Sequence, residues 1–145
     1  MRLDLYQADT ERIAHEQTSL LDQARERILA GPALNRLEES GVLHALQVLA
    51  ENAIGKAKHI VKACNIPVPV SAYDAFLSLK QLDKLGNASI EEWNAIIGLR
   101  NRIVHDYMNI DMALVLGIVR EQRYRIVTEF LIQPFPAATG VSPTP

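Results

Sequence analysis

Apolar residues recur at helical spacing along nearly the whole chain, and this periodicity constrains the fold more than any other feature of the sequence. The first stripe consists of Ile13, Leu20, Leu21, Ala24 and Ile28. It ends at Gly31-Pro32, a pair that is typical of a helix terminus. No stretch alternates apolar and polar residues over the length of a strand. The sequence therefore predicts an all-α fold.

The longest predicted helix runs from near Asn35 to Ala63. The apolar positions of its main stripe are Leu43, Leu46, Leu49, Ala53, Ile54, Ala57 and Ile60. Val42, Ala45 and Val48 widen this stripe beyond what a helix with one buried side needs. The helix is therefore either central to the bundle or covered on a second side by a partner chain, and we favour the partner chain.

Prolines and capping residues delimit the third predicted helix. Pro67 and Pro69 cannot continue a helix, because each lacks a backbone N–H and restricts the residue before it. Ser71 is a suitable N-cap for a short helix that reaches about Leu82 and is closed by Gly86-Asn87. This segment is thus predicted as a short helix between two loops.

Two further helices follow. Ser89 and Glu92 have the spacing of a capping box and predict the start of a fourth helix, in which we expect Trp93 to be a core anchor. Asp111 can cap a fifth helix that reaches about Ile132. We expect a bundle of four or five helices over residues 1–133, and a disordered tail over residues 134–145, which is rich in Pro, Ala, Gly, Ser and Thr.

Composition narrows the class of protein. The 145 residues include 48% hydrophobic and 22% charged side chains, which is ordinary for one globular domain. No signal peptide is evident, Ala113–Val119 is too short to span a bilayer, and the single cysteine fits a reducing compartment, so we expect a soluble, cytoplasmic protein. A net charge of −2 argues against non-specific coating of nucleic acid but allows a local basic cleft.

The chemistry is concentrated in the stretch GLRNRIVHDY, residues 98–107. Histidine exchanges protons near neutral pH, and His105 can serve as an acid or base. Arginine binds phosphate oxygens in a bidentate manner, which suits Arg100 to a phosphodiester. Tyr107 adds a hydroxyl and an aromatic face. Together these groups are suited to cleavage of RNA without a metal ion or other cofactor.

Helical geometry leaves two arrangements open for this site. Residues five apart do not share a helix face, so Arg100 and His105 of one chain would diverge, whereas Arg100 and Tyr107 would be neighbours on a continuous helix. Either the helix breaks near Val104, or the site combines residues from two chains across a two-fold axis.

The spacing R-x4-H-x-Y at Arg100, His105 and Tyr107 resembles the signature of HepT-type toxins of the HEPN ribonuclease superfamily, and the resemblance covers roughly residues 34–131. It implies a toxin of a type II toxin–antitoxin system that is a homodimeric, metal-independent endoribonuclease with its cleft between the protomers. It also implies an antitoxin, a minimal nucleotidyltransferase, that neutralises the toxin by adding AMP to a tyrosine.

Carried over to this chain, the resemblance gives each motif residue a role. Arg100 would stabilise the phosphate, His105 would act in acid–base catalysis, and Tyr107 would accept AMP. Asn101 would orient the site or the RNA, and Arg102, which lies outside the core signature, is a candidate RNA contact. The RNA substrate could be tRNA or mRNA.

Each residue also has a structural interpretation. Arg100 and Arg102 could interact with the helix macrodipole, His105 could be a satisfied boundary histidine, and Tyr107 could be a core aromatic residue. The alternatives to a nuclease are a non-catalytic helical or RNA-binding subunit of a nucleotidyltransferase complex, and a structural dimerisation module. The intact Arg–His pair favours the enzyme.

Two charged features outside the motif have open interpretations. Glu51 lies among apolar neighbours of the long helix and either meets an arginine of the motif or sits at the edge of the stripe. The residues Arg120, Glu121, Arg123 and Arg125 form either a solvated face or an extension of an RNA track.

Overall fold

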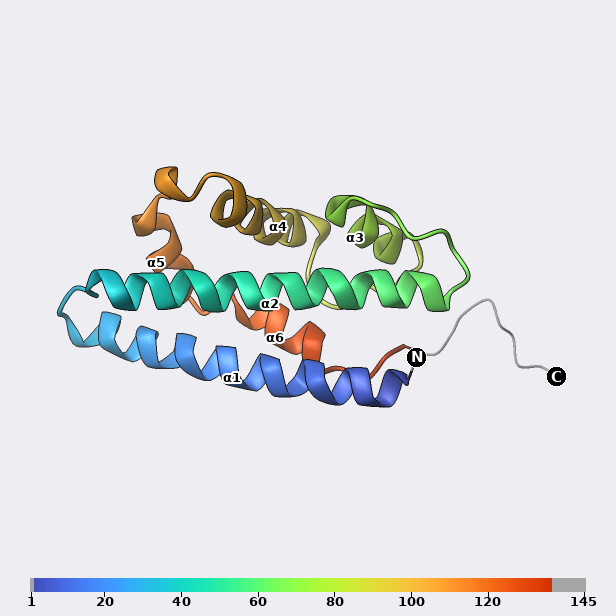
Figure 1. Cartoon of the computed structure of the whole chain (residues 1–145), viewed down its shortest axis with the longest axis horizontal. Coiled ribbons are helices and arrows are strands. Elements are labelled where there is room, and N and C mark those ends of the chain that lie inside the picture. The colour runs from blue at the N-terminus through green and yellow to red at the C-terminus, as the bar shows by residue number, and fades with distance from the viewer. Residues whose placement is uncertain (1, 137–145) are drawn as a thin grey trace.

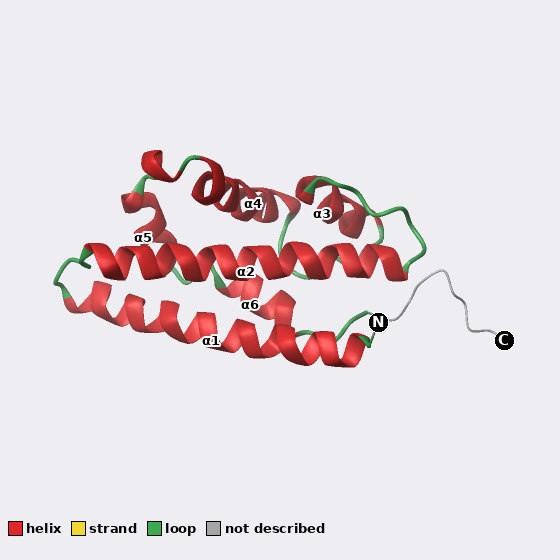
Figure 2. Ribbon diagram, viewed as in Figure 1, coloured by secondary structure: helices red, strands yellow, loops and turns green. Residues whose placement is uncertain are grey.

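The computed structural model describes residues 2–136, and every regular element in that range is helical. The elements are α1 (Leu3–Ala30), α2 (Arg36–Ala63), α3 (Ala72–Gln81), α4 (Ile90–His105), the 3-10 turn η1 (Tyr107–Asn109), α5 (Met112–Arg120) and α6 (Arg125–Ile132). Figure 2 shows helices joined by loops throughout the described chain. The all-α prediction is confirmed.

Helices α1 and α2 form a long antiparallel hairpin (Figure 1). Helix α1 ends at Gly31, whose φ of 121° is readily accessible only to glycine. Helix α2 begins with the capping box of Asn35 and Glu38: the Glu38 amide donates to Asn35 Oδ1 at 2.8 Å, and the Asn35 amide donates to Glu38 Oε1 at 2.9 Å. Local sequence thus fixes both ends of the turn.

Helix α2 is the central element of the bundle. It packs against α1, α3, α4 and α6 of the same chain. Val42 and Ala45 are buried and Val48 is half-buried by these neighbours. The preference for a partner chain as the cover of this stripe is therefore wrong, because the chain covers its own central helix. The homodimer stays a prediction.

The predicted fifth helix is two helices. The chain turns between α5 and α6 at Gln122, whose φ is 56°, and the Gln122 amide donates to the Val119 carbonyl at 3.0 Å. The buried Tyr124 donates its hydroxyl hydrogen bond to Asp22 of α1, and Arg125 Nη2 lies 3.6 Å from Asp22 Oδ2. The turn is decided by these contacts with α1, which helical periodicity along the chain does not reveal.

Aromatic rings tie α3, α4 and α6 together beside α2. The Trp93 ring stacks on Phe76 with centroids 4.3 Å apart and meets Phe130 edge-on at 5.0 Å. Trp93 is 1% exposed, which confirms it as a core anchor. This cluster holds the first half of α4 against the bundle.

The C-terminal end of α6 is anchored by a buried lysine. Lys56 Nζ donates to the carbonyl oxygens of Phe130 at 2.8 Å, Leu131 at 3.3 Å and Gln133 at 2.5 Å. Burial lowers the pKa of Lys56 to about 8, against a smaller raising influence of Glu11. The ammonium thus takes up carbonyls that a helix end leaves without intrahelical partners.

The predicted tail begins at residue 134, and its first residues are described. Phe135 packs against the Tyr6 ring with centroids 5.8 Å apart and lies 5.3 Å from Lys56 Nζ. The remainder, residues 137–145, lies outside the described residues, and so does the expectation of disorder there. Within residues 2–136, none of the helices combines the length and apolarity needed to cross a membrane.

Candidate active site

Helix α4 presents the motif and runs without interruption to His105. Ser89 and Glu92 form the predicted capping box at its start. At its end the Asp106 amide donates to the Arg102 carbonyl at 2.8 Å, and Asn109 Nδ2 donates to Asp106 Oδ1 at 2.7 Å, which turns the chain into η1. The helix therefore ends directly after His105, one residue beyond Val104, and this break comes too late to bring Arg100 and His105 of one chain together.

Arg100 and His105 point in different directions within one chain. Five residues of α-helix separate their side chains by about 140° around the axis and by about 7.5 Å along it. Arg100 faces α2, whereas His105 is exposed. A single copy of the chain does not bring the two groups together.

The Arg100 guanidinium is held between two polar side chains. Its Nη1 donates to Asn101 Oδ1 at 3.0 Å, and its Nη2 lies 3.5 Å from Glu51 Oε2 on α2. Gln47 Nε2 donates to the same Glu51 oxygen at 3.2 Å. Arg100 Nε is buried without a partner in the described chain. Of the two interpretations of Glu51, the contact with the motif arginine is correct.

His105 and Arg102 form the exposed part of the motif. They are three residues apart, so their side chains leave the same side of α4. Neither side chain makes a hydrogen bond or ion pair with any residue of the 2–136 range. Both are therefore open to a ligand or to a second protein chain.

Tyr107 lies beyond the helix, in η1, so the expectation that it neighbours Arg100 on a continuous helix is wrong. Its side chain is 48% exposed. It borders a hollow that Arg36 and Ser40 of α2 also line, together with Met108. The sequence did not predict that Arg36 lies near Tyr107, because about seventy positions separate the two residues and no local signal links them.

A second hollow lies beside Arg100, between α4 and the α5–α6 segment. Apolar side chains that include Ile96, Leu99 and Ile118 form its walls, and Arg123 adds a guanidinium. Of the other members of the predicted cluster, Arg125 pairs with Asp22, and Arg120 and Glu121 are exposed. One member of that cluster therefore lies near the motif, and the group is not a continuous track on one helix.

No group of three or more His, Cys, Asp or Glu side chains with metal-site spacing occurs among the described residues. The charged groups at this end of α4 are instead guanidinium and imidazole, with Glu51 beside Arg100 and Asp106 directly after His105 as the nearby carboxylates. Such a set can bind a phosphodiester and exchange protons with it.

An exposed histidine, a partly buried arginine and an accessible tyrosine at the end of one helix of a bundle define a candidate helical ribonuclease. Comparison with known proteins agrees. A family model described as "Ribonuclease HepT-like" matches residues 13–133. The chain belongs to the HepT-like ribonuclease family.

Individual relatives of the chain share between 19% and 31% sequence identity with it. The chain is 31% identical over 84 residues to the mRNA nuclease HepT of Shewanella oneidensis, a match that covers 58% of this chain and 62%, less than two thirds, of that relative. A crystal structure of a toxin–antitoxin with AMP-PNP shares the fold at a TM-score of 0.73 and 20% identity, covering 87% of this chain and 93% of that one.

A second solved structure is the tri-AMPylated HEPN toxin of Shewanella oneidensis in complex with an MNT antitoxin. It matches at a TM-score of 0.71 and 19% identity, with the same coverage of 87% and 93%. At this level of identity, both structures show a common fold.

Proposed function

We propose that this protein is the toxin of a toxin–antitoxin pair and that it cuts RNA without a metal ion, at a site formed by two copies of the chain. The observation that carries the proposal is the exposed and unengaged His105 at the end of α4, in a chain of the HepT-like family. The substrate of such a toxin is cellular RNA. We therefore propose that the protein acts in the cytoplasm.

The proposed reaction is an attack of the ribose 2′-hydroxyl on the neighbouring phosphorus. His105 accepts the 2′-hydroxyl proton, and the 2′-oxygen forms a bond to phosphorus while the bond to the 5′-oxygen breaks. A protonated group or water supplies a proton to the departing 5′-oxygen. Arg100 stabilises the charge that develops on the phosphate oxygens. The products are a 2′,3′-cyclic phosphate and a 5′-hydroxyl.

Two copies are needed because Arg100 and His105 diverge on one α4. A two-fold axis near this helix end would set the arginine of one copy opposite the histidine of the other. Val104 and Met108 are apolar side chains of this region that are 41% and 91% exposed, and contact with a second copy would bury them. Asn101 would hold Arg100 in position, and Arg102 would contact the RNA backbone.

Control by a nucleotidyltransferase antitoxin fits the position of Tyr107. Its side chain is 48% exposed on a short turn, so a second protein can reach it. AMP on this tyrosine would add bulk and negative charge within two residues of His105, and RNA would be excluded from the site. The solved HEPN toxin of similar fold is AMPylated and bound to an MNT antitoxin, which supports this part of the proposal.

The decisive experiment compares two histidine variants of the purified protein on RNA, with EDTA present. We expect wild type and His15→Ala to cleave and to leave 2′,3′-cyclic ends, because His15 is exposed on α1 and borders a hollow with α6 that no residue of the motif lines. We expect His105→Ala to lose at least a hundredfold in rate while its sedimentation coefficient remains that of a dimer.

Two results would contradict this proposal. Cleavage that stops on chelation and returns with a divalent cation would assign the chemistry to a metal. RNA binding without cleavage by the wild-type protein would favour a non-catalytic subunit of a nucleotidyltransferase complex.

A further inference from the structure

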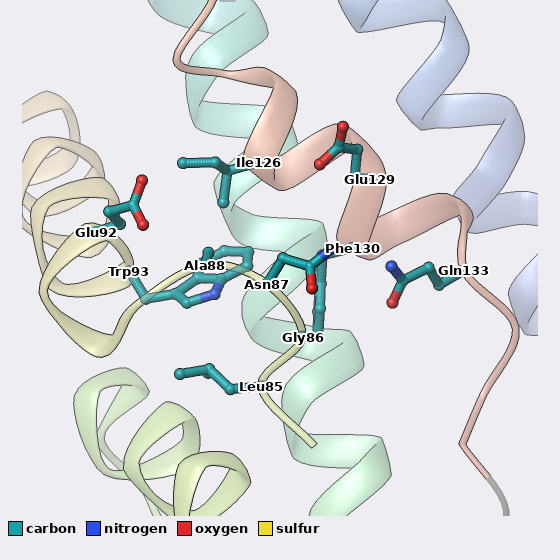
Figure 3. A pocket seen from close by; sticks show the side chains of 10 residues that line it. All are labelled: Leu85, Gly86, Asn87, Ala88, Glu92, Trp93, Ile126, Glu129, Phe130 and Gln133. Carbon is teal, nitrogen blue, oxygen red and sulfur yellow. The ribbon is translucent and has the colours of Figure 1, made fainter. Parts of the chain in front are cut away.

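A hollow of about 110 Å³ opens between α4 and α6, and no residue of the motif lines it (Figure 3). Its apolar walls include Leu85, Ile126 and Phe130. Glu92 of α4 and Glu129 of α6 lie on opposite sides of it. Its lining is thus partly apolar and partly able to form hydrogen bonds, which is typical of a site for a small molecule.

Within this hollow, Trp93 presents a hydrogen-bond donor that has no partner. Trp93 is 1% exposed, and its Nε1–H is buried and finds no acceptor in the described chain. Its ring cannot turn away, because Phe76 stacks on one face at 4.3 Å. A buried donor without an acceptor costs about 1–3 kcal/mol. A ligand that offers an acceptor here would recover that cost.

Three further polar side chains that line the hollow also lack hydrogen-bond partners among the described residues. The Glu129 carboxylate and the side-chain amides of Asn87 and Gln133 make no hydrogen bond or ion pair with any described residue. Glu129 is a pure acceptor, whereas the amides both donate and accept. A matching ligand must therefore carry donors on one edge and acceptors on another.

We propose that this hollow binds a guanine base of single-stranded RNA. Guanine offers its N1–H and N2–H₂ donors side by side, which suits the Glu129 carboxylate. Its O6 and N7 atoms are acceptors and suit the Trp93 indole N–H and the Asn87 amide. Its flat ring suits the apolar walls formed by Ile126 and Phe130.

Other occupants match fewer of these groups. A lysine or arginine side chain of a protein partner would satisfy Glu129 but has no acceptor for the Trp93 N–H. Adenine has a single donor group, N6–H₂, beside the lone pair of N1, so it would satisfy one oxygen of the Glu129 carboxylate and direct a lone pair at the other. Phosphate is disfavoured by the two carboxylates, Glu92 and Glu129.

The hollow continues toward the motif, and this link rests on the proposed ribonuclease function. Glu92 and Ile126 line both this hollow and the one beside Arg100. Trp93 and Arg100 are seven residues apart on α4, so they leave nearly the same side of the helix about 10 Å apart. A strand with its phosphate at Arg100 could therefore place a nearby base in the hollow, and the cut would lie a few nucleotides from a guanosine.

The first test uses the protein's own fluorophore, because Trp93 is the single tryptophan of the chain. Wild-type protein is titrated with guanosine, inosine and adenosine, none of which carries a phosphate. We expect guanosine to change the fluorescence saturably and to bind about tenfold more tightly than adenosine, with inosine between them. Glu129→Gln should remove the preference for guanosine, whereas Glu121→Gln, an exposed glutamate outside the hollow, should keep it.

The second test uses the cleavage-deficient His105→Ala protein and uridine oligonucleotides that carry one guanosine or one adenosine. We expect about tenfold tighter binding of the guanosine oligonucleotide, and we expect Glu129→Gln to abolish only this difference. Equal affinities in both tests would overturn the guanine site. Glu129→Gln protein that keeps its RNA preference but loses affinity for the antitoxin would assign the surface to a protein partner and overturn it too.

Failure of the nuclease function would look different. In that case the wild-type protein would leave RNA intact, while the guanosine titration, which needs neither Arg100 nor His105, would still report on the hollow directly.

Discussion

Arg100 of α4 meets Glu51 of α2, with Nη2 of the arginine 3.5 Å from Oε2 of the glutamate. The side chains are 27% and 40% exposed, so the pair contributes little to stability. Asn101 and Gln47 bind the same two groups, the first at Arg100 and the second at Glu51. The arrangement therefore orients a guanidinium, and it also places a negative charge where a phosphate would bind.

Glu51→Gln removes that negative charge and keeps an oxygen that can accept from Arg100. We expect the variant, in a His105→Ala background, to bind RNA several-fold more tightly, because the carboxylate no longer competes with phosphate for the guanidinium. The free energy of unfolding should change by less than about 1 kcal/mol. Electrophoretic mobility shifts and urea unfolding measure the two quantities. Unchanged RNA affinity with a large loss of stability would show that the pair is purely structural.

Tyr107→Phe removes the hydroxyl that we propose as the AMP acceptor. Intact-mass analysis after co-expression with the nucleotidyltransferase should show added AMP on the wild type and none on the variant. Tyr73→Phe is a matched control, because Tyr73 is 40% exposed against 48% for Tyr107. AMP on the Tyr107→Phe protein would place the modification on another residue.

Lys56 predicts a rise of stability at alkaline pH. Its pKa is about 8 in the folded protein and 10.5 in the unfolded chain, because burial disfavours the ammonium. Between these values the unfolded chain binds more protons, so the free energy of unfolding increases with pH. Relative to Lys56→Met, we expect wild type to gain about 1–3 kcal/mol from pH 8 to pH 10.5. Urea unfolding at several pH values measures this, and parallel curves for the two proteins would contradict it.

Gln122 at the α5–α6 turn predicts a stabilising substitution. Its φ of 56° is a conformation that glycine adopts without steric cost. We expect Gln122→Gly to raise the free energy of unfolding by about 0.5–1 kcal/mol and Gln122→Val to lower it, because a β-branched residue is disfavoured there. Thermal unfolding orders the three proteins. Equal free energies of unfolding for the three proteins would contradict the prediction, because they would mean that the positive φ at residue 122 has little effect on stability.

Helix ends in this protein were predictable where short-range chemistry sets them. Ser89 with Glu92 forms the capping box that the sequence predicts, and Asn35, near which the long helix was expected to begin, forms a further capping box with Glu38. Asp111 likewise accepts from the Leu114 amide at 3.2 Å. The boundary missed was the α5–α6 turn, because apolar periodicity continues across it and the contact with Asp22 that holds it is about a hundred residues away in sequence.

By itself the sequence determined the helices, most of their ends and the residue types of the motif, because these depend on neighbours within one or two helical turns. Tertiary structure alone decided that α2 lies at the centre, that Arg100 meets Glu51, and that Arg100 and His105 point apart on an unbroken α4. The hollow at Trp93 also depends on the packing of α4 beside α6. The physical reason is that such contacts join residues far apart along the chain, and only the way the helices pack determines which of them meet.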